Sequence, residues 1–361
     1  MRGDAALNRF ADLMRVPIVQ APMAGGGSRP ELAAAVSETG GLGFLAAGYK
    51  TAEQMYSEIA GARRLTSEPF GVNVFVPRPS VADPEAVAAY LAELEPEATR
   101  VGVDIGEAVW EDDDWAAKLD VLRTDPVPVV SFTFGCPTKN EIAALQRVGS
   151  IVVVTVTTPR EAALAAEAGA DGLTLQGIEA GGHRGSFGDP EGTEDDHGLL
   201  ALISEVRATV DLPLIAAGGI MEARGVAAIL AAGAGAAALG TAFLRSPESG
   251  ASPTHKAALV DPRFTTTDVT RAFSGRRARG LVNRFMTDHP DAPVAYPEIN
   301  NATKALRRAA AETGDAETLH LWAGQGFRLA QDIPADEIVE GLVTELRSVL
   351  EELEETASTL E

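Results

Sequence analysis

Residues 214–241 read LIAAGGIMEARGVAAILAAGAGAAALGT, and this stretch decides the fold. It opens with a short apolar strand, runs through Gly218-Gly219 into an alanine-rich helix, and returns to a second apolar strand that ends at Gly240-Thr241. Two strands joined by a crossover helix form a parallel pair. Because both strands are apolar along their whole length, we expect a sheet that is covered on both faces.

The same stretch contains a segment that meets the length test for a membrane span. Residues 226–244 are uncharged and largely apolar for nineteen residues, close to the length of a spanning helix. They are mostly alanine and glycine, however, and Gly233 and Gly235 divide them. A buried helix at Ala223–Ala232, a turn and a buried strand starting at Ala236 explain the segment better.

Short apolar strands alternate with helical stretches over the whole of the first 245 residues. Eight such units predict an α/β protein, a (β/α)8 TIM barrel. An open doubly wound sheet is less consistent with the sequence, because the Gly25-Gly26-Gly27 run does not have G-x-G-x-x-G spacing. The predicted strands are Ile18–Gln20, Gly43–Ala46, Gly71–Phe75, Val127–Phe132, Ile151–Val156, Gly172–Leu175, Leu214–Ala216 and Ala236–Gly240.

The strand–helix alternation stops after Leu244, which suggests a division of the chain. We expect residues 1–245 to form the barrel and residues 246–319 to form a smaller appended α+β domain over the barrel mouth. Residues 320–361 would return to the barrel and end in a helix over Ala335–Leu353, whose apolar residues have helical spacing. Arg100–Ile105 is interpreted as an extra strand or an extended excursion between barrel units.

Composition excludes several classes of protein. The 361 residues carry a formal net charge of −22, which would repel a nucleic-acid backbone. Cys136 is the single cysteine and no two histidines have H-x-x-x-H spacing, so neither a disulfide nor a cysteine or histidine metal site is expected. No signal peptide is visible, so we expect a soluble cytoplasmic protein without a membrane partner. The sequence does not indicate an oligomeric state.

Two strand ends carry paired small residues in the position where barrels bind phosphate. Gly218 and Gly219 follow the seventh predicted strand, and Gly240 and Thr241 follow the eighth. Backbone N–H groups that no side chain obstructs, next to a helix N-terminus, suit a dianionic phosphate. A single Gly-Gly pair is more often a simple turn, but two such pairs after consecutive strands favour a phosphate site.

The sixth predicted strand runs into a second glycine-rich segment, QGIEAGGHRG, at residues 176–185. Gly181 and Gly182 would let the backbone approach a flat ring, and the Gln176 amide can donate to and accept from a pyrimidine-like edge. His183 would then be presented on a loop above that ring. A lone histidine is more often a surface or core residue, but its place after a strand end in a glycine-lined loop favours a catalytic role.

The sequence resembles the nitronate monooxygenase family, formerly called 2-nitropropane dioxygenases, and its bacterial class I in particular. The matching stretches span most of the chain. They are residues 17–47 (PIVQAPMAGGGSRPELAAAVSETGGLGFLAA), 69–75 (PFGVNVF), 131–137 (SFTFGCP), 177–187 (GIEAGGHRGSF), 214–219 (LIAAGG) and 323–326 (AGQG).

This resemblance implies FMN as the cofactor and His183 as the catalytic residue. Tyr296 and Lys304 match residues near the substrate, with Asn300 where the family pattern has a tyrosine, and Arg277 where it has a proline. Residues implied to contact FMN are Ala21, Pro22, Met23, Asn73, Gln176, Gly181, Gly218, Gly219, Gly240, Thr241, Gln325 and Gly326.

The implied reaction is the oxidation of alkyl nitronates, such as propionate 3-nitronate, by O2 to a carbonyl compound and nitrite. His183 would bind the nitronate by a hydrogen bond or remove the α-proton of a nitroalkane, since its ordinary pKa lies near working pH. The nearest alternative is an FMN-dependent reductase that uses NAD(P)H, of the enoyl-ACP or quinone reductase type. A flavin-binding protein without turnover and a nucleotide dehydrogenase, which would need a catalytic cysteine loop, are more distant alternatives.

Overall fold

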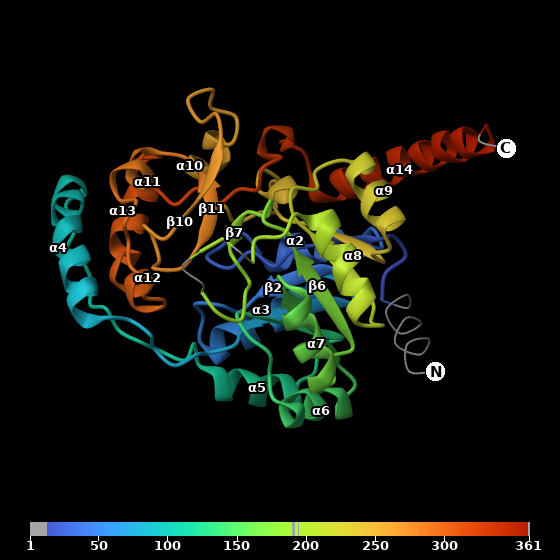
Figure 1. Ribbon diagram of the computed structural model, residues 1–361, viewed down its shortest axis with the longest axis horizontal. Helices are drawn as coiled ribbons and strands as arrows, with labels where there is room; N and C mark the ends of the chain where they lie inside the picture. Colours follow the sequence, from blue (N-terminus) through green and yellow to red (C-terminus); the bar gives the residue numbers. More distant parts are fainter. Residues whose placement is uncertain (1–12, 190–191, 194, 360–361) are drawn as a thin grey trace.

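The computed structural model describes residues 13–189, 192–193 and 195–359. Eight parallel strands lie side by side in the order β1-β9-β8-β6-β5-β4-β3-β2 and curve into a barrel that helices surround (Figure 1). The strands are β1 Ile18–Gln20, β2 Gly43–Ala46, β3 Phe70–Phe75, β4 Val129–Thr133, β5 Ile151–Val156, β6 Gly172–Gln176, β8 Leu214–Ala217 and β9 Ala236–Leu239.

The barrel closes between its first two strands, β1 and β2. The backbone N–H of Gln20 donates to the Leu42 carbonyl at 3.0 Å, and the Leu42 N–H donates to the Ile18 carbonyl at 2.9 Å. The side chain of Gln20 is fully buried and accepts a hydrogen bond from the backbone N–H of Phe44 at 2.9 Å. The predicted TIM barrel is confirmed, and the predicted strand boundaries agree with the structure to within two residues.

The barrel helices begin and end at residues that the local sequence favours. Thr51 and Thr138 form capping boxes at the start of α3 and α6, and Gly169 and Gly233 end α7 and α9 in the left-handed conformation. The helices around the barrel are α2 Pro30–Glu38, α3 Ala52–Leu65, α5 Trp115–Thr124, α6 Lys139–Arg147, α7 Pro159–Ala168, α8 Leu199–Thr209, α9 Ala223–Ala232 and α14 Ala335–Ser358.

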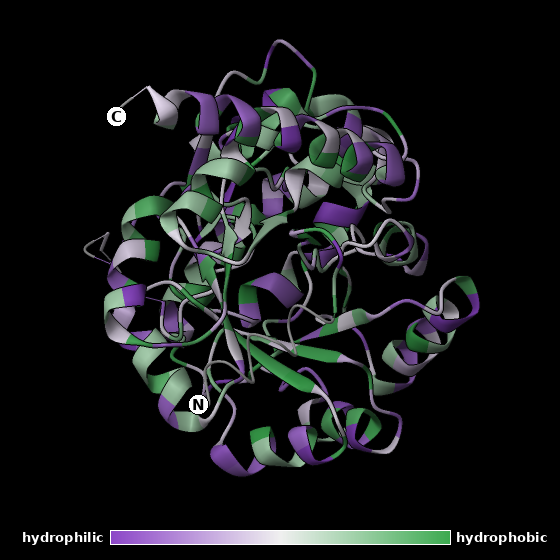
Figure 2. Cartoon of the chain, turned by 90° about the vertical axis from the view of Figure 1, so that its right-hand side faces the viewer, coloured by the Kyte–Doolittle hydropathy of each residue, from purple (hydrophilic) through white to green (hydrophobic). Residues whose placement is uncertain are grey.

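The C-terminal helix α14 completes the ring of helices. It packs against α9 and α2, the helices that contact the paired strands β9 and β1. Ile338, Leu342 and Leu346 are buried on its inner face, while its last turns extend past the body of the molecule (Figure 1). The helices carry their hydrophilic residues outward and their apolar residues toward the strands (Figure 2). The prediction that this helix packs on the barrel is confirmed.

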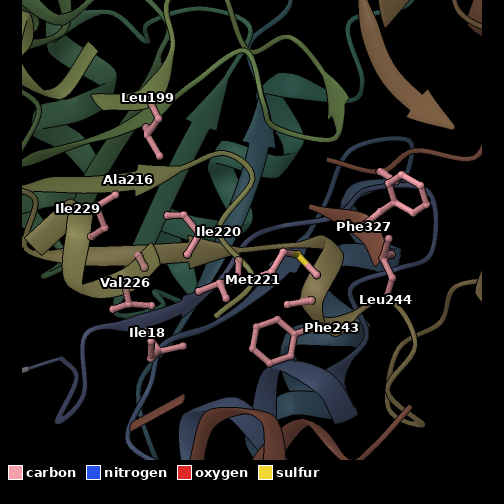
Figure 3. Close-up of a cluster of buried hydrophobic side chains, with 14 of the residues drawn as sticks. Ile18, Leu199, Ala216, Ile220, Met221, Val226, Ile229, Phe243, Leu244 and Phe327 are labelled. Atoms are coloured by element: carbon pink, nitrogen blue, oxygen red, sulfur yellow. The ribbon is translucent and has the colours of Figure 1, made fainter. Parts of the chain in front are cut away.

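A hydrophobic cluster includes the residues that directly follow the Gly218-Gly219 turn (Figure 3). Ile220 and Met221, the next two residues, bury their side chains beside Val226 of α9 and Phe243. Phe243 belongs to η1 (Thr241–Phe243), a single 3-10 turn that follows β9. The apolar core thus holds both glycine-containing strand ends in place.

A second, three-stranded sheet lies beside the barrel in the order β10-β11-β7. Its strands are β10 Thr267–Thr270, β11 Ala278–Leu281 and β7 Gly182–His183, and both pairings are antiparallel. The neighbouring helices are α4 Pro84–Val101, α10 Pro253–Ala258, α11 Arg284–Asp288, α12 Glu298–Ala302 and α13 Lys304–Thr313.

Helix α4 shares a hydrophobic cluster with this second group of elements. Tyr90 and Leu94 of α4 pack with Phe273 and Phe285, and the Tyr90 hydroxyl donates to the Ala272 carbonyl at 2.6 Å. The division of the chain at residues 245 and 319 stays a prediction. The packing adds that a segment inserted between β3 and β4 contributes to the core of the later elements.

The structure tests the interpretation of residues 100–105 and the question of a membrane-spanning helix. The interpretation of Arg100–Ile105 as a strand is wrong, because Arg100 and Val101 form the last turn of α4 and Gly102 ends the helix with φ 75°. Residues 103–111 then form an extended excursion without regular secondary structure. In the part of the chain that the structure describes, no helix is both long enough and apolar enough to cross a membrane.

Candidate functional site

A cavity of about 520 Å³ opens at the carboxyl ends of the barrel strands, within the usual size range of small-molecule sites. Most of the site residues expected from the sequence line it. They are Ala21, Pro22, Met23, Asn73, Gln176, Gly181, His183, Gly218, Gly219, Gly240, Thr241 and Lys304. Tyr296 and Gly326 are outside this lining and contact residues that belong to it, while Gln325 contacts Glu179, which is also outside the lining.

The Gly218-Gly219 turn has a backbone that other residues adopt only with strain. Gly218 has φ 145° and Gly219 has φ 66°. A Cβ at Gly219 would stand 3.1 Å from Cβ of Glu179, and one at Gly218 would stand 3.4 Å from the Gly177 backbone. The two glycines therefore leave an open backbone surface at the end of β8, which fits a phosphate group.

Close backbone contacts join three loops behind this turn. A Cβ at Gly181 would stand 2.5 Å from backbone atoms of Ala323 and Gly324, and a Cβ at Gly326 would stand 2.9 Å from the Gly219 carbonyl oxygen. The Gln325 N–H donates to the Glu179 carbonyl at 3.0 Å. Gln325 and Gly326 thus support the glycine turn from behind, which differs from direct lining of the cavity.

The two amide side chains in the cavity are held by their own neighbours. The Asn73 Nδ2 donates to the hydroxyls of Ser131 and Thr133, which leaves its Oδ1 as the acceptor. The Gln176 Nε2 donates to the His183 carbonyl at 3.0 Å, and its Oε1 accepts from the Gly185 N–H at 2.7 Å. Gln176 therefore fixes the backbone that carries His183.

His183 lies on a short strand, and the expectation of a loop is wrong at this point. It pairs with Ala278 of β11, so the second sheet presents the imidazole to the cavity. Its Nε2 is 2.8 Å from the Ser274 hydroxyl, which also lies 3.2 Å from the Arg276 carbonyl oxygen. The hydroxyl has one proton for these two acceptors. When it donates to Nε2, the imidazole proton lies on Nδ1, which can then donate to a bound anion.

His183 is neutral at working pH, contrary to the expectation of an ordinary pKa. Burial, together with the positive charges of Arg276 and Arg307, lowers the pKa of His183 from 6.5 to about 3. The Arg307 guanidinium donates to Thr303 and Asn300, and the Arg276 guanidinium donates to backbone carbonyls. The acceptors in these contacts are uncharged, so they do not neutralise the two positive charges. A neutral imidazole in a positive field favours an anion over a cation in this cavity.

Aromatic side chains form a wall around His183. Its ring lies 5.4 Å from Trp322, 5.6 Å from Tyr296 and 6.0 Å from Phe134, measured between ring centroids. The Arg276 guanidinium stacks over Phe134 at 4.2 Å. These rings account for the burial that keeps the imidazole neutral.

Sequence reasoning missed several cavity residues. Phe134 directly follows β4 and Tyr49 is the third residue after β2, so the rule that selected other strand ends would have found them. Arg307 and Trp322 come from the segments after the barrel strands, and no motif points to them. The cavity also contains His255 and His320, although neither has a sequence context that suggests a site.

The departures from the family pattern have structural roles. Asn300 lines the cavity, and its Oδ1 accepts a hydrogen bond from Arg307 at 2.9 Å. Arg277 is buried and forms an ion pair with Asp196, away from this cavity. Burial raises the pKa of the Cys136 thiol to about 11, which keeps it protonated and unsuited to nucleophilic catalysis. In the described residues, no three or more His, Cys, Asp or Glu side chains form a metal site.

The chain matches the family model described as nitronate monooxygenase over residues 8–345. It is 44% identical to the nitronate monooxygenase of Pseudomonas aeruginosa over 353 residues, which cover 94% of this chain and 99% of the relative. It is 39% identical to a probable nitronate monooxygenase of Staphylococcus aureus, covering 95% and 98% of the two chains.

Two solved structures are similar to this chain over nearly its whole length. The nitroalkane oxidase from Streptomyces ansochromogenes superposes with a TM-score of 0.93 at 53% identity, over 95% of this chain and 99% of that one. FabK from Thermotoga maritima superposes with a TM-score of 0.72 at 30% identity, over 96% and 98% of the two chains. Given the family match over nearly the whole chain, the barrel and the cavity at its strand ends, this protein belongs to the nitronate monooxygenase family, whose members are flavin-dependent oxidoreductases.

Proposed function

We propose that the protein oxidises alkyl nitronates with O2, using FMN, to a carbonyl compound and nitrite. The observation that carries the proposal is the position of His183 in the cavity beside two guanidinium groups. Arg307 lines the cavity, and Arg276 stacks behind it on Phe134. Such a site attracts a small anion and offers it hydrogen-bonding groups. A nitronate is a delocalised anion of this kind.

The cavity offers groups suited to both parts of a flavin mononucleotide, its phosphate and its ring. The strand ends at Gly218-Gly219 and Gly240-Thr241 provide backbone for the single phosphate, and Asn73 offers an acceptor for a ring N–H. Ala21, Pro22, Met23 and Gly181 would contact the ring. When bound, the flavin accepts electrons from the substrate and passes them to O2.

His183 would hold the substrate and would not act as a strong base. With the Ser274 hydroxyl donating to Nε2, the imidazole proton is on Nδ1, which would donate a hydrogen bond to a nitronate oxygen. Tyr296, whose ring is 5.6 Å from the His183 ring, and Lys304 on the cavity wall would contact the rest of the substrate.

The alternative function is an FMN-dependent reductase that takes hydride from NAD(P)H. The structural similarity to FabK at 30% identity favours this possibility, although the similarity to the nitroalkane oxidase is closer on both measures. Steady-state assays separate the two. The purified protein should release nitrite and consume O2 with an alkyl nitronate, and should not oxidise NADH or NADPH with an enoyl thioester or a quinone.

The cofactor is tested separately by mild denaturation. We expect a yellow protein that releases FMN without a covalent bond. Release of FAD, or a colourless protein that FMN cannot reconstitute, would contradict the FMN assignment while leaving family membership intact.

A further inference from the structure

Tyr49 occupies the cavity wall in a conformation that the surrounding structure must enforce. It is the third residue after β2 and has φ 66°, in the left-handed region that bulky residues rarely adopt. A strained conformation of this kind persists only where neighbouring groups hold it. The ring packs edge-on against Phe75 at 5.3 Å.

The group that holds Tyr49 is a partly buried carboxylate, Asp113, whose side chain is 17% exposed. Oδ1 of Asp113 accepts the backbone N–H of Tyr49 at 2.8 Å. The neighbouring Asp114 accepts the backbone N–H of Ala52 at 2.7 Å, so the two acidic residues bind both ends of the loop after β2. Asp113 and Asp114 themselves have φ 55° and 59°.

A fully buried lysine completes the arrangement. The Lys118 ammonium lies 2.7 Å from Oδ2 of Asp113 and donates to the Ala47 carbonyl at 2.9 Å. Its side chain has no exposed surface. Removing these two charges from water is unfavourable in itself. A hydrophobic pair in the same place would therefore stabilise the loop at least as well. The ion pair instead fixes the loop through directional contacts.

The Tyr49 hydroxyl has a proton to donate. Tyr296 donates its hydroxyl proton to the Tyr49 oxygen at 3.1 Å. Within the described part of the chain, no hydrogen bond from the Tyr49 hydroxyl to an acceptor is found. The Tyr49 ring lines the cavity, and Tyr296 links its hydroxyl to the aromatic wall around His183. Burial raises the pKa of Tyr49 to about 12, so the proton stays on the oxygen.

We propose that Tyr49 is a catalytic residue that donates a hydrogen bond to a nitronate oxygen, and that Asp113 and Lys118 are positioning residues that act through it. The inference rests on the proposed function. Tyr296 polarises the Tyr49 hydroxyl by donating to it, which strengthens the bond that Tyr49 gives to the anion. The backbone N–H groups of the glycine turns were assigned to the phosphate, so the Tyr49 hydroxyl is a separate donor for the substrate.

The first test is Tyr49→Phe, with Tyr56→Phe as the matched control because Tyr56 is half exposed on α3. A hydrogen bond to a charged group corresponds to about a 10- to 100-fold effect. We expect kcat/KM for a nitronate to fall by about this factor. The inhibition constant of nitrate, a planar anion with nitronate-like oxygens, should rise by a similar factor. Flavin content and thermal midpoint should match the control.

The second test separates positioning from simple support of the fold. Asp113→Asn should also weaken nitrate binding, and Tyr49→Phe/Asp113→Asn should bind nitrate no more weakly than Tyr49→Phe alone, because Asp113 acts through Tyr49. If Asp113→Asn does not fold with Lys118 unpaired, Asp113→Asn/Lys118→Met removes both charges and takes its place in the cycle. Multiplied effects would overturn the positioning role.

The outcomes distinguish this inference from the proposed function. If the unmodified protein turns over nitronate and Tyr49→Phe equals the Tyr56→Phe control, the inference is wrong and the function stands. If the unmodified protein does not turn over nitronate, the function is wrong, and nitrate binding still tests the donor. Loss of flavin in Tyr49→Phe would overturn the inference, because Tyr49 would then bind the cofactor.

Discussion

Replacement of His183 by asparagine tests how the cavity uses its imidazole. A histidine with an ordinary pKa could remove the α-proton of a nitroalkane, and its loss would then affect nitroalkanes at least about tenfold more than preformed nitronates. The structure leads to the opposite expectation. Asparagine can still hydrogen-bond to Ser274 and to an anion, so His183→Asn should lose a similar factor on both substrates.

The magnitude follows from the pKa of His183. A general base contributes about 10²–10⁴-fold, which is about 3–5 kcal/mol. Lowering the pKa from 6.5 to about 3 removes about 5 kcal/mol of driving force for proton transfer to the imidazole. The two effects cancel, and what remains is one neutral hydrogen bond of about 0.5–1.5 kcal/mol, or about 2- to 13-fold.

The assay is nitrite release with a nitronate prepared at high pH and with the parent nitroalkane at neutral pH, measured before the two forms interconvert. Flavin content is measured on both proteins as a control. A loss on nitroalkane that exceeds the loss on nitronate by tenfold or more would refute the reasoning, because His183 would then be a base despite its surroundings. Absence of loss on either substrate would remove His183 from the site.

Three further predictions follow from the cavity wall. Gly219→Asp should abolish flavin retention by placing a carboxylate beside the phosphate, while Gly341→Asp, in open space on α14, should retain the flavin; equal retention would place the phosphate elsewhere. Gly181→Ala should lower both flavin content and thermal midpoint, because its Cβ would meet backbone atoms 2.5 Å away; an unchanged midpoint would contradict this. Burial lowers the pKa of His255 to about 4, so the unfolded chain binds a proton below pH 6.5 that the folded chain does not. His255 should therefore contribute about 2 kcal/mol to the fall in the free energy of unfolding between pH 7 and 5, in addition to the contributions of His183 and His320, whose pKa values burial also lowers. In urea titrations, His255→Gln should reduce the fall by about this amount.

The barrel could be predicted because its signals are local. Each strand is a short apolar run, and each glycine pair stands directly at a strand end, so spacing alone orders them around the sheet. The 226–244 segment is a good example, since Gly233 adopts φ 102° and ends α9 where the sequence divides the segment. Arg100 and Val101 show the limit. Their β-like pattern is overridden by the packing of α4 against later elements.

The electrostatics of the site could not be predicted in the same way. The pKa of His183 depends on Arg276 and Arg307, which are 93 and 124 positions away in sequence and reach the imidazole only through the second sheet and α13. Tyr49 was within reach of the strand-end rule, but its partner Asp113 comes from the irregular excursion after α4, and Lys118 comes from the first turns of α5. Long-range contacts of this kind leave no periodicity in the sequence.

The central claim is that a nitronate, and not a reduced nicotinamide, is the electron donor. The most direct measurement mixes the purified yellow protein anaerobically with an alkyl nitronate and, in separate samples, with NADH and NADPH, and follows the visible flavin absorbance. The account predicts that the nitronate bleaches the flavin within the time of one turnover and that air restores the colour. Rapid bleaching by NADH or NADPH, with none by the nitronate, would contradict it.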